Sequence, residues 1–288
     1  MIPPSFDYHA PRSIGEAVSL LASLGDEAKV LAGGHSLLPM MKLRFAQPAH
    51  LIDLGSIQEL RGIREESGTL VIGAMTTEAE LIGSSVIRNK VPLLAEGAST
   101  IADPQVRYKG TIGGDISHGD PGNDQPAFML ALDASFVLTG PKGQRTVKAD
   151  GYFLGLYETQ LAADEILAQI RIPIPAPGSG WSYQKLKRKT GDFATAATAV
   201  LLQMKGGKVA RVTIALTNAG PTALRVRAAE AALTGKPLDE GRLREAARLA
   251  MSICSPTPDQ RGDVAYKTAM CGEMTRRALQ AAAARAKG

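Results

Sequence analysis

The chain has 288 residues, of which 44% are hydrophobic and 21% are charged, and its formal net charge is +5. This composition excludes a disordered protein, and the length favours two globular domains. No segment has the roughly 18 uncharged apolar residues of a membrane span. The N-terminus lacks an apolar signal core, so we expect a cytoplasmic protein without a transmembrane segment.

The positive charge raises the question of nucleic-acid binding. Basic residues alternate with acidic ones, and only 5% of residues are aromatic, so the pattern favours a solvated basic surface over a nucleic-acid interface. The candidate metal ligands are scattered without the spacing of a metal site: Cys254, Cys271, His9, His35, His50 and His118. We therefore expect no metal site, two core thiols, and an organic cofactor for any redox chemistry.

The first half of the chain predicts short helices and strands in succession. Residues 13–25 have a helical apolar period between a capping Ser13 and a terminating Gly25. Helical periods return at residues 78–87 and 91–102. Apolar runs bounded by turn residues predict strands at 28–33, 50–55, 69–77, 135–140, 145–149 and 165–175. This mixture favours an α+β fold over a strictly alternating doubly wound sheet.

Residues 172–180 (IPIPAPGSG) concentrate proline and glycine, and we place a domain boundary there. The predicted domains are 1–177, with subdomains of about 1–55 and 56–177, and 178–288. Residues 181–220 predict three strands with a hairpin turn at KGGK, and alanine-rich amphipathic helices follow from about residue 222. The second domain should therefore be a small sheet with a helix cluster.

Residues 31–40 (LAGGHSLLPM) join a predicted strand to a predicted helix. A strand that stops at Gly33 and Gly34 leaves consecutive N–H groups unpaired, and glycine lets them turn toward one point. Ser36 suits the N-cap, Pro39 falls in the first helical turn, and the helix dipole attracts phosphate. The segment predicts either an anion-binding nest or only a tight turn, because it matches neither standard phosphate-binding motif.

A second glycine-rich loop at residues 109–128 precedes a helix that Asn123 or Asp124 would cap. Two such loops in one domain favour one extended ligand. Asp115, Asp120 and Asp124 would be repelled by a diphosphate and suit sugar or ribityl hydroxyls. The pattern favours a dinucleotide with a polyhydroxyl chain, and the alternative is that these acids are turn and cap residues.

Four segments carry a resemblance to a known family: LAGGHSLLPMMKLR, IADPQVRYKGTIGGD, GDPGNDQPA and KLKRKTGDFATAA. They look like the FAD-binding (medium) flavoprotein subunits of the molybdenum hydroxylase (xanthine dehydrogenase) superfamily, and within it the aerobic molybdenum-containing carbon monoxide dehydrogenase branch. The resemblance covers essentially the whole chain. It implies a two-part FAD-binding domain of the PCMH/vanillyl-alcohol-oxidase type, followed by a small C-terminal domain of antiparallel sheet plus helices.

The resemblance also implies positions for the cofactor contacts. Two loops would wrap the FAD diphosphate and its neighbours with Ala32, Gly33, Gly34, His35 and Ser36, and with Thr111, Ile112, Gly113, Gly114 and Asp115. Further contacts would come from Lys29, Ile101, Ala102, Asp124, Leu167 and Lys185. Asp192 and Phe193 would lie near the flavin ring, although relatives often have tyrosine in place of Phe193. A phenylalanine ring can shield the flavin as a tyrosine ring would. The alternative is that Phe193 is a core residue of a strand.

The implied function is electron transfer through a non-covalently bound FAD, with no catalytic residue and no metal in this chain. A separate molybdopterin-containing large subunit would oxidise CO with water to CO2. A separate iron–sulfur small subunit with [2Fe-2S] clusters would relay electrons, and FAD would pass them to an external, quinone-type acceptor. The complex would be a dimer of heterotrimers, cytoplasmic or peripheral at the inner face of the cytoplasmic membrane.

Three alternative functions remain open from the sequence. The chain could be the FAD subunit of another molybdenum hydroxylase, acting on a purine, an N-heterocycle or an aldehyde. It could be a stand-alone flavin oxidase or reductase, or a basic module that binds nucleic acid.

Overall fold

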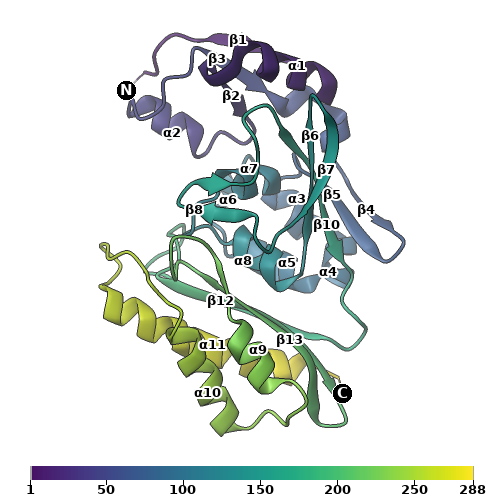
Figure 1. Cartoon of the computed structure of the whole chain (residues 1–288), viewed down its shortest axis with the longest axis vertical. Coiled ribbons are helices and arrows are strands. Elements are labelled where there is room, and N and C mark those ends of the chain that lie inside the picture. The colour runs from purple at the N-terminus through teal and green to yellow at the C-terminus, as the bar shows by residue number, and fades with distance from the viewer. Residues whose placement is uncertain (1, 288) are drawn as a thin grey trace.

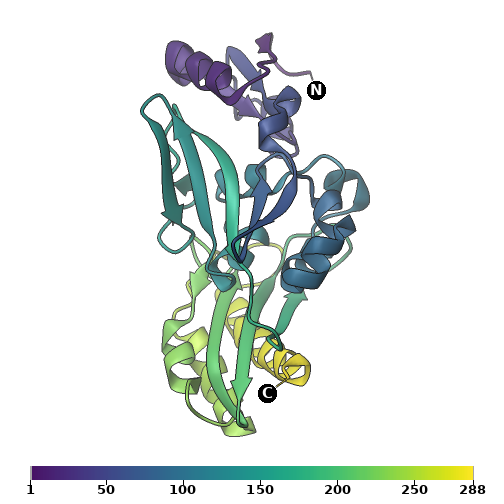
Figure 2. The same ribbon diagram turned by 90° about the vertical axis from the view of Figure 1, so that its right-hand side faces the viewer.

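The computed structural model describes residues 2–287, and its elements form three units stacked along the long axis of the molecule (Figure 1 and Figure 2). The first unit has a three-stranded parallel sheet in the order β1-β3-β2, and α1 packs against it. Its elements are β1 (Asp7–His9), α1 (Ile14–Leu24), η1 (Gly25–Glu27), β2 (Ala28–Leu31), α2 (Leu37–Lys42) and β3 (His50–Asp53).

The middle unit is built on a five-stranded antiparallel sheet in the order β4-β5-β10-β6-β7. The short helices η2 (Leu54–Ser56) and η3 (Gln58–Leu60) lead into it. Its strands are β4 (Ile63–Glu66), β5 (Thr69–Gly73), β6 (Ser135–Gly140), β7 (Gly143–Lys148) and β10 (Ile166–Pro173), with a separate ladder of β8 (Phe153–Gly155) and β9 (Glu158–Thr159). Between β5 and β6 the chain forms α3 (Glu78–Gly83), α4 (Ser85–Lys90), α5 (Pro92–Ser99), α6 (Pro104–Arg107), α7 (Ile112–His118) and α8 (Gln125–Ala131).

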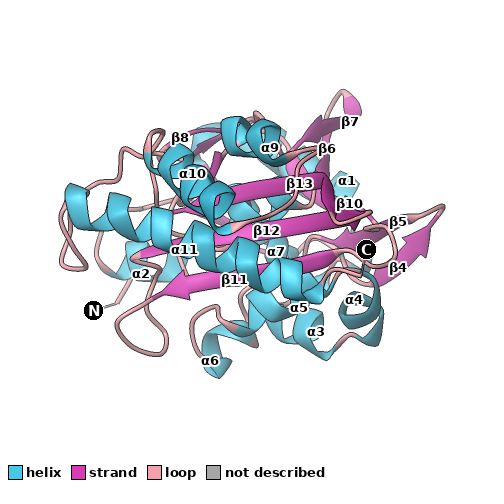
Figure 3. Cartoon of the chain, turned by 90° about the horizontal axis from the view of Figure 1, so that it is seen from below, coloured by secondary structure: helices cyan, strands magenta, loops and turns pink. Residues whose placement is uncertain are grey.

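The last unit is a four-stranded antiparallel sheet in the order β11-β12-β13-β14, with a helix layer seen in front of it in Figure 3. Its elements are β11 (Gly180–Leu186), β12 (Ala196–Lys205), β13 (Lys208–Thr217), β14 (Leu224–Arg225), α9 (Arg227–Leu233), α10 (Glu240–Met251) and α11 (Val264–Arg285). Helices α5 and α8 of the middle unit also pack against this sheet. One hydrophobic core therefore runs from Phe128 and Phe136 of the middle unit to Tyr183 and Ala199 of the last.

The predicted α+β fold class is confirmed by this arrangement. The helix expected at 13–25 forms between its two caps, where the Ser13 hydroxyl accepts the Glu16 N–H at 3.2 Å and Gly25 has φ +55°. The helix expected at 78–87 divides into α3 and α4, because Ser84 has an extended backbone and its hydroxyl accepts the Ile87 N–H at 3.3 Å to cap α4. The helix expected at 91–102 forms as α5, which starts at Pro92. The proposed boundary at 172–180 overlaps the end of β10 and the start of β11, and residues 174–179 connect these two strands. Among residues 2–287, no helix is both long and apolar enough to cross a membrane.

Candidate cofactor site

A cavity of about 530 Å³ opens between the first and middle units, and both glycine loops lie in its wall. Leu167 of β10 also lines it, beside a register shift in the pairing of β10 with β6. This cavity brings together eleven of the predicted cofactor residues: Lys29, Ala32, Gly33, Gly34, His35, Ser36, Thr111, Gly113, Gly114, Asp115 and Leu167.

The first loop leaves four consecutive N–H groups unpaired at the cavity wall. Within residues 2–287, no protein acceptor pairs with the backbone N–H of Gly33, Gly34, His35 or Ser36. Gly34 has φ +75°, a conformation that glycine adopts without strain. Ser36 occupies the predicted N-cap position of α2, but its side chain makes no capping bond. Unpaired N–H groups are costly unless a ligand or water satisfies them, so this loop is suited to hold an anion.

The second loop packs directly against the first. The Thr111 hydroxyl accepts the Gly114 N–H at 3.1 Å and so caps α7. A Cβ added to Gly33 would lie 2.3 Å from the Lys109 carbonyl oxygen, and one added to Gly114 would lie 3.6 Å from the Ala32 Cβ. The two loops therefore meet at a separation that only glycine at position 33 permits.

Two acids with raised pKa values lie at the second loop: Glu78 is buried behind it, and Asp115 belongs to it and lines the cavity. Glu78 is 1% exposed, and its carboxyl oxygens accept from the Gln125 Nε2 at 3.0 and 2.9 Å. Burial, and then the neighbouring Asp115, raise the pKa of Glu78 well above its usual range. Burial also raises the pKa of Asp115 to about 7, and the charges of Asp124 and Asp120 add to that shift. Asp115 is therefore largely neutral below pH 7, which allows it to lie near a phosphate.

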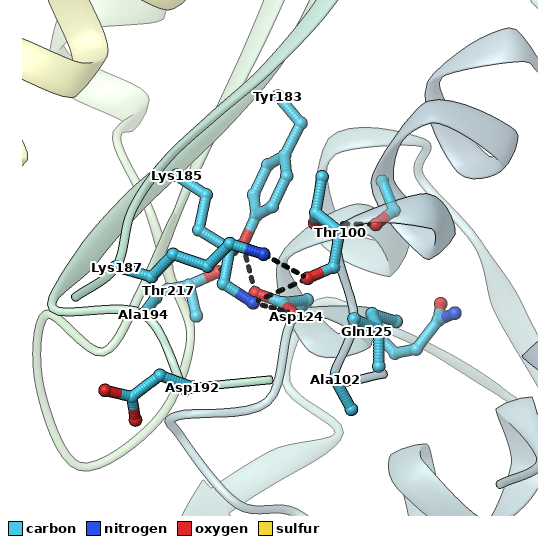
Figure 4. A network of polar contacts seen from close by, with 12 residues as sticks. Thr100, Ala102, Asp124, Gln125, Tyr183, Lys185, Lys187, Asp192, Ala194 and Thr217 are labelled. Atoms are coloured by element: carbon cyan, nitrogen blue, oxygen red, sulfur yellow. Dashed lines mark hydrogen bonds and ion pairs between the residues drawn. The ribbon is translucent and has the colours of Figure 1, made fainter. Parts of the chain in front are cut away.

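A second polar group gathers where α8 meets β11 (Figure 4). Asp124 is 4% exposed, and its two carboxylate oxygens accept from the Lys185 Nζ at 2.6 Å and from the Tyr183 hydroxyl. Lys185 and Lys187 both donate to the Thr100 carbonyl, at 3.3 and 3.2 Å. Burial raises the pKa of Asp124, and the adjacent Lys185 opposes that shift. The group combines two ammonium groups with one carboxylate and so concentrates positive charge.

The remaining predicted residues lie outside the cavity wall. Ile101 and Ala102 follow α5, and Figure 4 shows Ala102 beside the second polar group. Ala102 has φ +43°, which is unusual for a residue other than glycine. Asp192 and Phe193 lie in the connection between β11 and β12. Phe193 is 46% exposed, so it is not a core strand residue. Ile112 is fully buried in the hydrophobic core of the middle unit.

The sequence allowed the acids of the second loop to be either ligand-binding residues or turn and cap residues, and the structure separates Asp120 from Asp124 in this respect. Asp120 is a turn residue, since its Oδ1 accepts the Gly122 N–H at 2.8 Å. Asp124 precedes α8, yet its side chain makes no capping bond and pairs with Lys185 instead. Asp124 thus occupies the expected N-cap position of α8, although its side chain does not cap the helix.

Sequence reasoning missed several polar residues of this region. Tyr183 and Lys187 lie two residues before and two residues after the predicted Lys185, in β11 and just beyond its end. Residues spaced by two in a strand point to the same face of the sheet, and this spacing was the available signal. Glu78 offered no such signal, because an acid in the first turn of a helix is usually exposed.

Two family models match nearly the whole chain. The model described as "FAD binding domain in molybdopterin dehydrogenase" matches residues 4–175, and that described as "CO dehydrogenase flavoprotein C-terminal domain" matches residues 181–282. The fold and the paired loops thus define a flavoprotein of the molybdopterin dehydrogenase class. The chain belongs to the family of FAD-binding subunits whose C-terminal domain is of the CO dehydrogenase type.

Individual relatives fall within the same family. The chain is 60% identical over 285 residues to the carbon monoxide dehydrogenase medium chain of Hydrogenophaga pseudoflava, covering 99% of each chain. It is 53% identical over 287 residues to that of Afipia carboxidovorans, covering 100% of each. A solved structure of the Hydrogenophaga pseudoflava enzyme, in a form that lacks the Mo-pyranopterin moiety, matches with a TM-score of 0.99 and 62% identity over 100% of each chain.

The raised pKa of Asp115 predicts how the stability of the FAD-free chain depends on pH. Between about pH 4 and pH 7 the unfolded chain loses this proton while the folded chain keeps it, so the free energy of unfolding falls as pH rises through that window. Asp115→Asn removes the carboxyl group that holds this proton, so the urea concentration at the unfolding midpoint should decline less steeply as pH rises. The exposed Asp164→Asn is the control, and an equally steep decline in Asp115→Asn would contradict the assignment.

Proposed function

We propose that this chain is the FAD-carrying electron-transfer subunit of a molybdenum-containing iron–sulfur flavoprotein that oxidises CO to CO2. The observation that carries the proposal is the cavity between two glycine loops, where four N–H groups have no protein acceptor within residues 2–287. It lies in the part of the chain that matches an FAD-binding domain. When bound, FAD exchanges electrons singly or in pairs, which suits a link between one-electron relays and a two-electron acceptor.

The residues present fit a dinucleotide with two phosphates. The N–H groups of the first loop suit the diphosphate, and a neutral Asp115 donates a hydrogen bond instead of repelling it. Asp124, held by Lys185, suits the hydroxyls of the cofactor. Lys187 brings a second ammonium group to the same place, and positive charge there stabilises the negative charge that a flavin gains on reduction.

The same proposal assigns the other redox centres to partner chains. Residues 2–287 hold no group of three or more His, Cys, Asp or Glu side chains placed to bind a metal ion. On the similarity to medium chains of carbon monoxide dehydrogenase, we assign molybdopterin to a large subunit and the [2Fe-2S] clusters to a small subunit, in a dimer of heterotrimers. The electrons leave to an external, quinone-type acceptor, and any attachment to the inner face of the cytoplasmic membrane is through the complex.

Bulky side chains in either loop should abolish FAD binding. In Gly33→Val and Gly114→Val the new side chain meets the Lys109 carbonyl and the Thr111 hydroxyl, so flavin should be lost on gel filtration. Asp124→Asn should weaken FAD binding by about tenfold to a hundredfold, since one charged hydrogen bond contributes about 1.5–3 kcal/mol. Gly83→Val, whose Cβ meets nothing within 4 Å, is the control. Equal flavin retention in all four variants would refute the site.

The isolated, FAD-loaded chain should not oxidise CO, because the substrate is assigned to the partner subunit. Activity with a quinone-like dye should appear only in the complex. Turnover by the chain alone would overturn the electron-transfer function. A complex that oxidises an N-heterocycle, a purine or an aldehyde but not CO would instead assign the chain to another molybdenum hydroxylase.

A further inference from the structure

The connection between β11 and β12 holds an aromatic ring that core packing does not fix. Phe193 is 46% exposed. One side of its ring meets the second glycine loop, since a Cβ added to Gly122 would lie 3.5 Å from the Phe193 Cδ1. The Arg261 guanidinium carbon lies 5.8 Å from the ring centroid. The position of Phe193 therefore depends on its contacts with Gly122 and with the Arg261 guanidinium over its ring, and not on full burial.

The residue before it, Asp192, is held by two arginines. Its Oδ1 accepts from the Arg261 Nε at 3.0 Å and Nη2 at 2.5 Å, and its Oδ2 accepts from the Arg188 Nε at 3.0 Å. The hydrogen bonds from Arg261, and then from Arg188, lower the pKa of Asp192 to about 2. Asp192 is 7% exposed, and charged donors from two arginines reach both oxygens of its carboxylate, which fixes the backbone beside Phe193.

Arg261 is itself anchored to the helix layer of the last unit. Its backbone N–H donates to the Asp259 Oδ1 at 2.7 Å, and its Nη1 donates to the Asp259 Oδ2 at 3.1 Å. Lys267 of α11, which is 1% exposed, pairs with the Asp259 Oδ1 at 2.9 Å and donates to the Thr257 carbonyl at 2.7 Å. A continuous series of polar contacts thus runs from α11 through Arg261 to Asp192.

On its other side the connection is tied to the second glycine loop. Asn218, which has φ +58°, donates its backbone N–H to the Pro121 carbonyl at 2.8 Å. Its Nδ2 donates to the Ala194 carbonyl at 2.7 Å. These two hydrogen bonds hold the connection that carries Phe193 against the second glycine loop of the FAD-binding domain, although Phe193 belongs to the last unit.

We propose that Arg261 is a positioning residue that fixes Phe193 as a shield over the flavin ring. The inference rests on the proposed function, because it needs FAD in the site. Arg261 lies 69 residues from Asp192 in the chain, and it acts through Asp192 and the Phe193 ring. Without it, Asp192 and Phe193 lose their contacts to the loop before α11, where the bond from the Arg188 Nη1 to the Gln260 carbonyl at 3.3 Å remains, and the ring is free to leave the flavin.

The test uses the FAD-loaded chain with Phe193→Trp as a reporter, because an indole in contact with a flavin quenches the flavin's fluorescence by electron transfer. Phe193→Trp should lower the emission per bound FAD severalfold. Adding Arg261→Gln should restore at least about half of the lost emission while the absorbance of bound FAD stays constant. Arg261→Lys should restore less. Arg248→Gln, which breaks an exposed ion pair with Glu245 on α10, is the control and should restore none.

The outcomes separate this inference from the proposed function. A parent chain that binds no FAD would refute the proposed function. Bound FAD without quenching in Phe193→Trp would leave FAD binding intact and overturn the shielding role of position 193. Quenching that persists unchanged in Arg261→Gln would overturn the role of Arg261. Asp192→Asn provides a second test should Arg261→Gln fail to fold, and it too should restore emission.

Discussion

The close approach of two backbone loops is the constraint on which the site depends. The Cα of Gly33 faces the Lys109 carbonyl so closely that a single added carbon would lie 2.3 Å from its oxygen. This contact joins the end of β2 to the segment before α7 and so joins the first unit to the middle one. It also keeps the N–H groups of the first loop away from protein acceptors within residues 2–287, which is costly in the empty chain and favourable once an anion is bound.

Charge is distributed to match an extended anionic ligand. Near the glycine loops, burial favours neutral forms of Glu78 and Asp115. At the second polar group, Lys185 and Lys187 outnumber Asp124 and concentrate positive charge. That second group exists only because α8 and β11 share a core, so the last unit completes a site whose loops lie in the first two.

The sequence predicted most of the fold and the residues of the cavity wall for identifiable reasons. The glycine loops have a local signature, and helices such as α1 have both an apolar period and caps. Ser36 and Asp124 stand at the predicted N-cap positions, but neither side chain bonds back to its helix. The Asp124 carboxylate pairs with Lys185 instead, and a tertiary contact of this kind has no local signal. Arg261 was missed because its partner is 69 residues away, and no local pattern encodes a pairing at that distance.

Competition between flavins shows whether the first loop holds the diphosphate of FAD. The deflavinated chain should be titrated with FAD, and riboflavin, which has the same ring but no phosphate, should be added as competitor. FAD should bind tightly, and riboflavin at the same concentration should displace almost none of it, because the N–H groups of the loop remain unpaired when riboflavin is bound. Displacement of FAD by an equal concentration of riboflavin would mean that the loop does not hold the diphosphate.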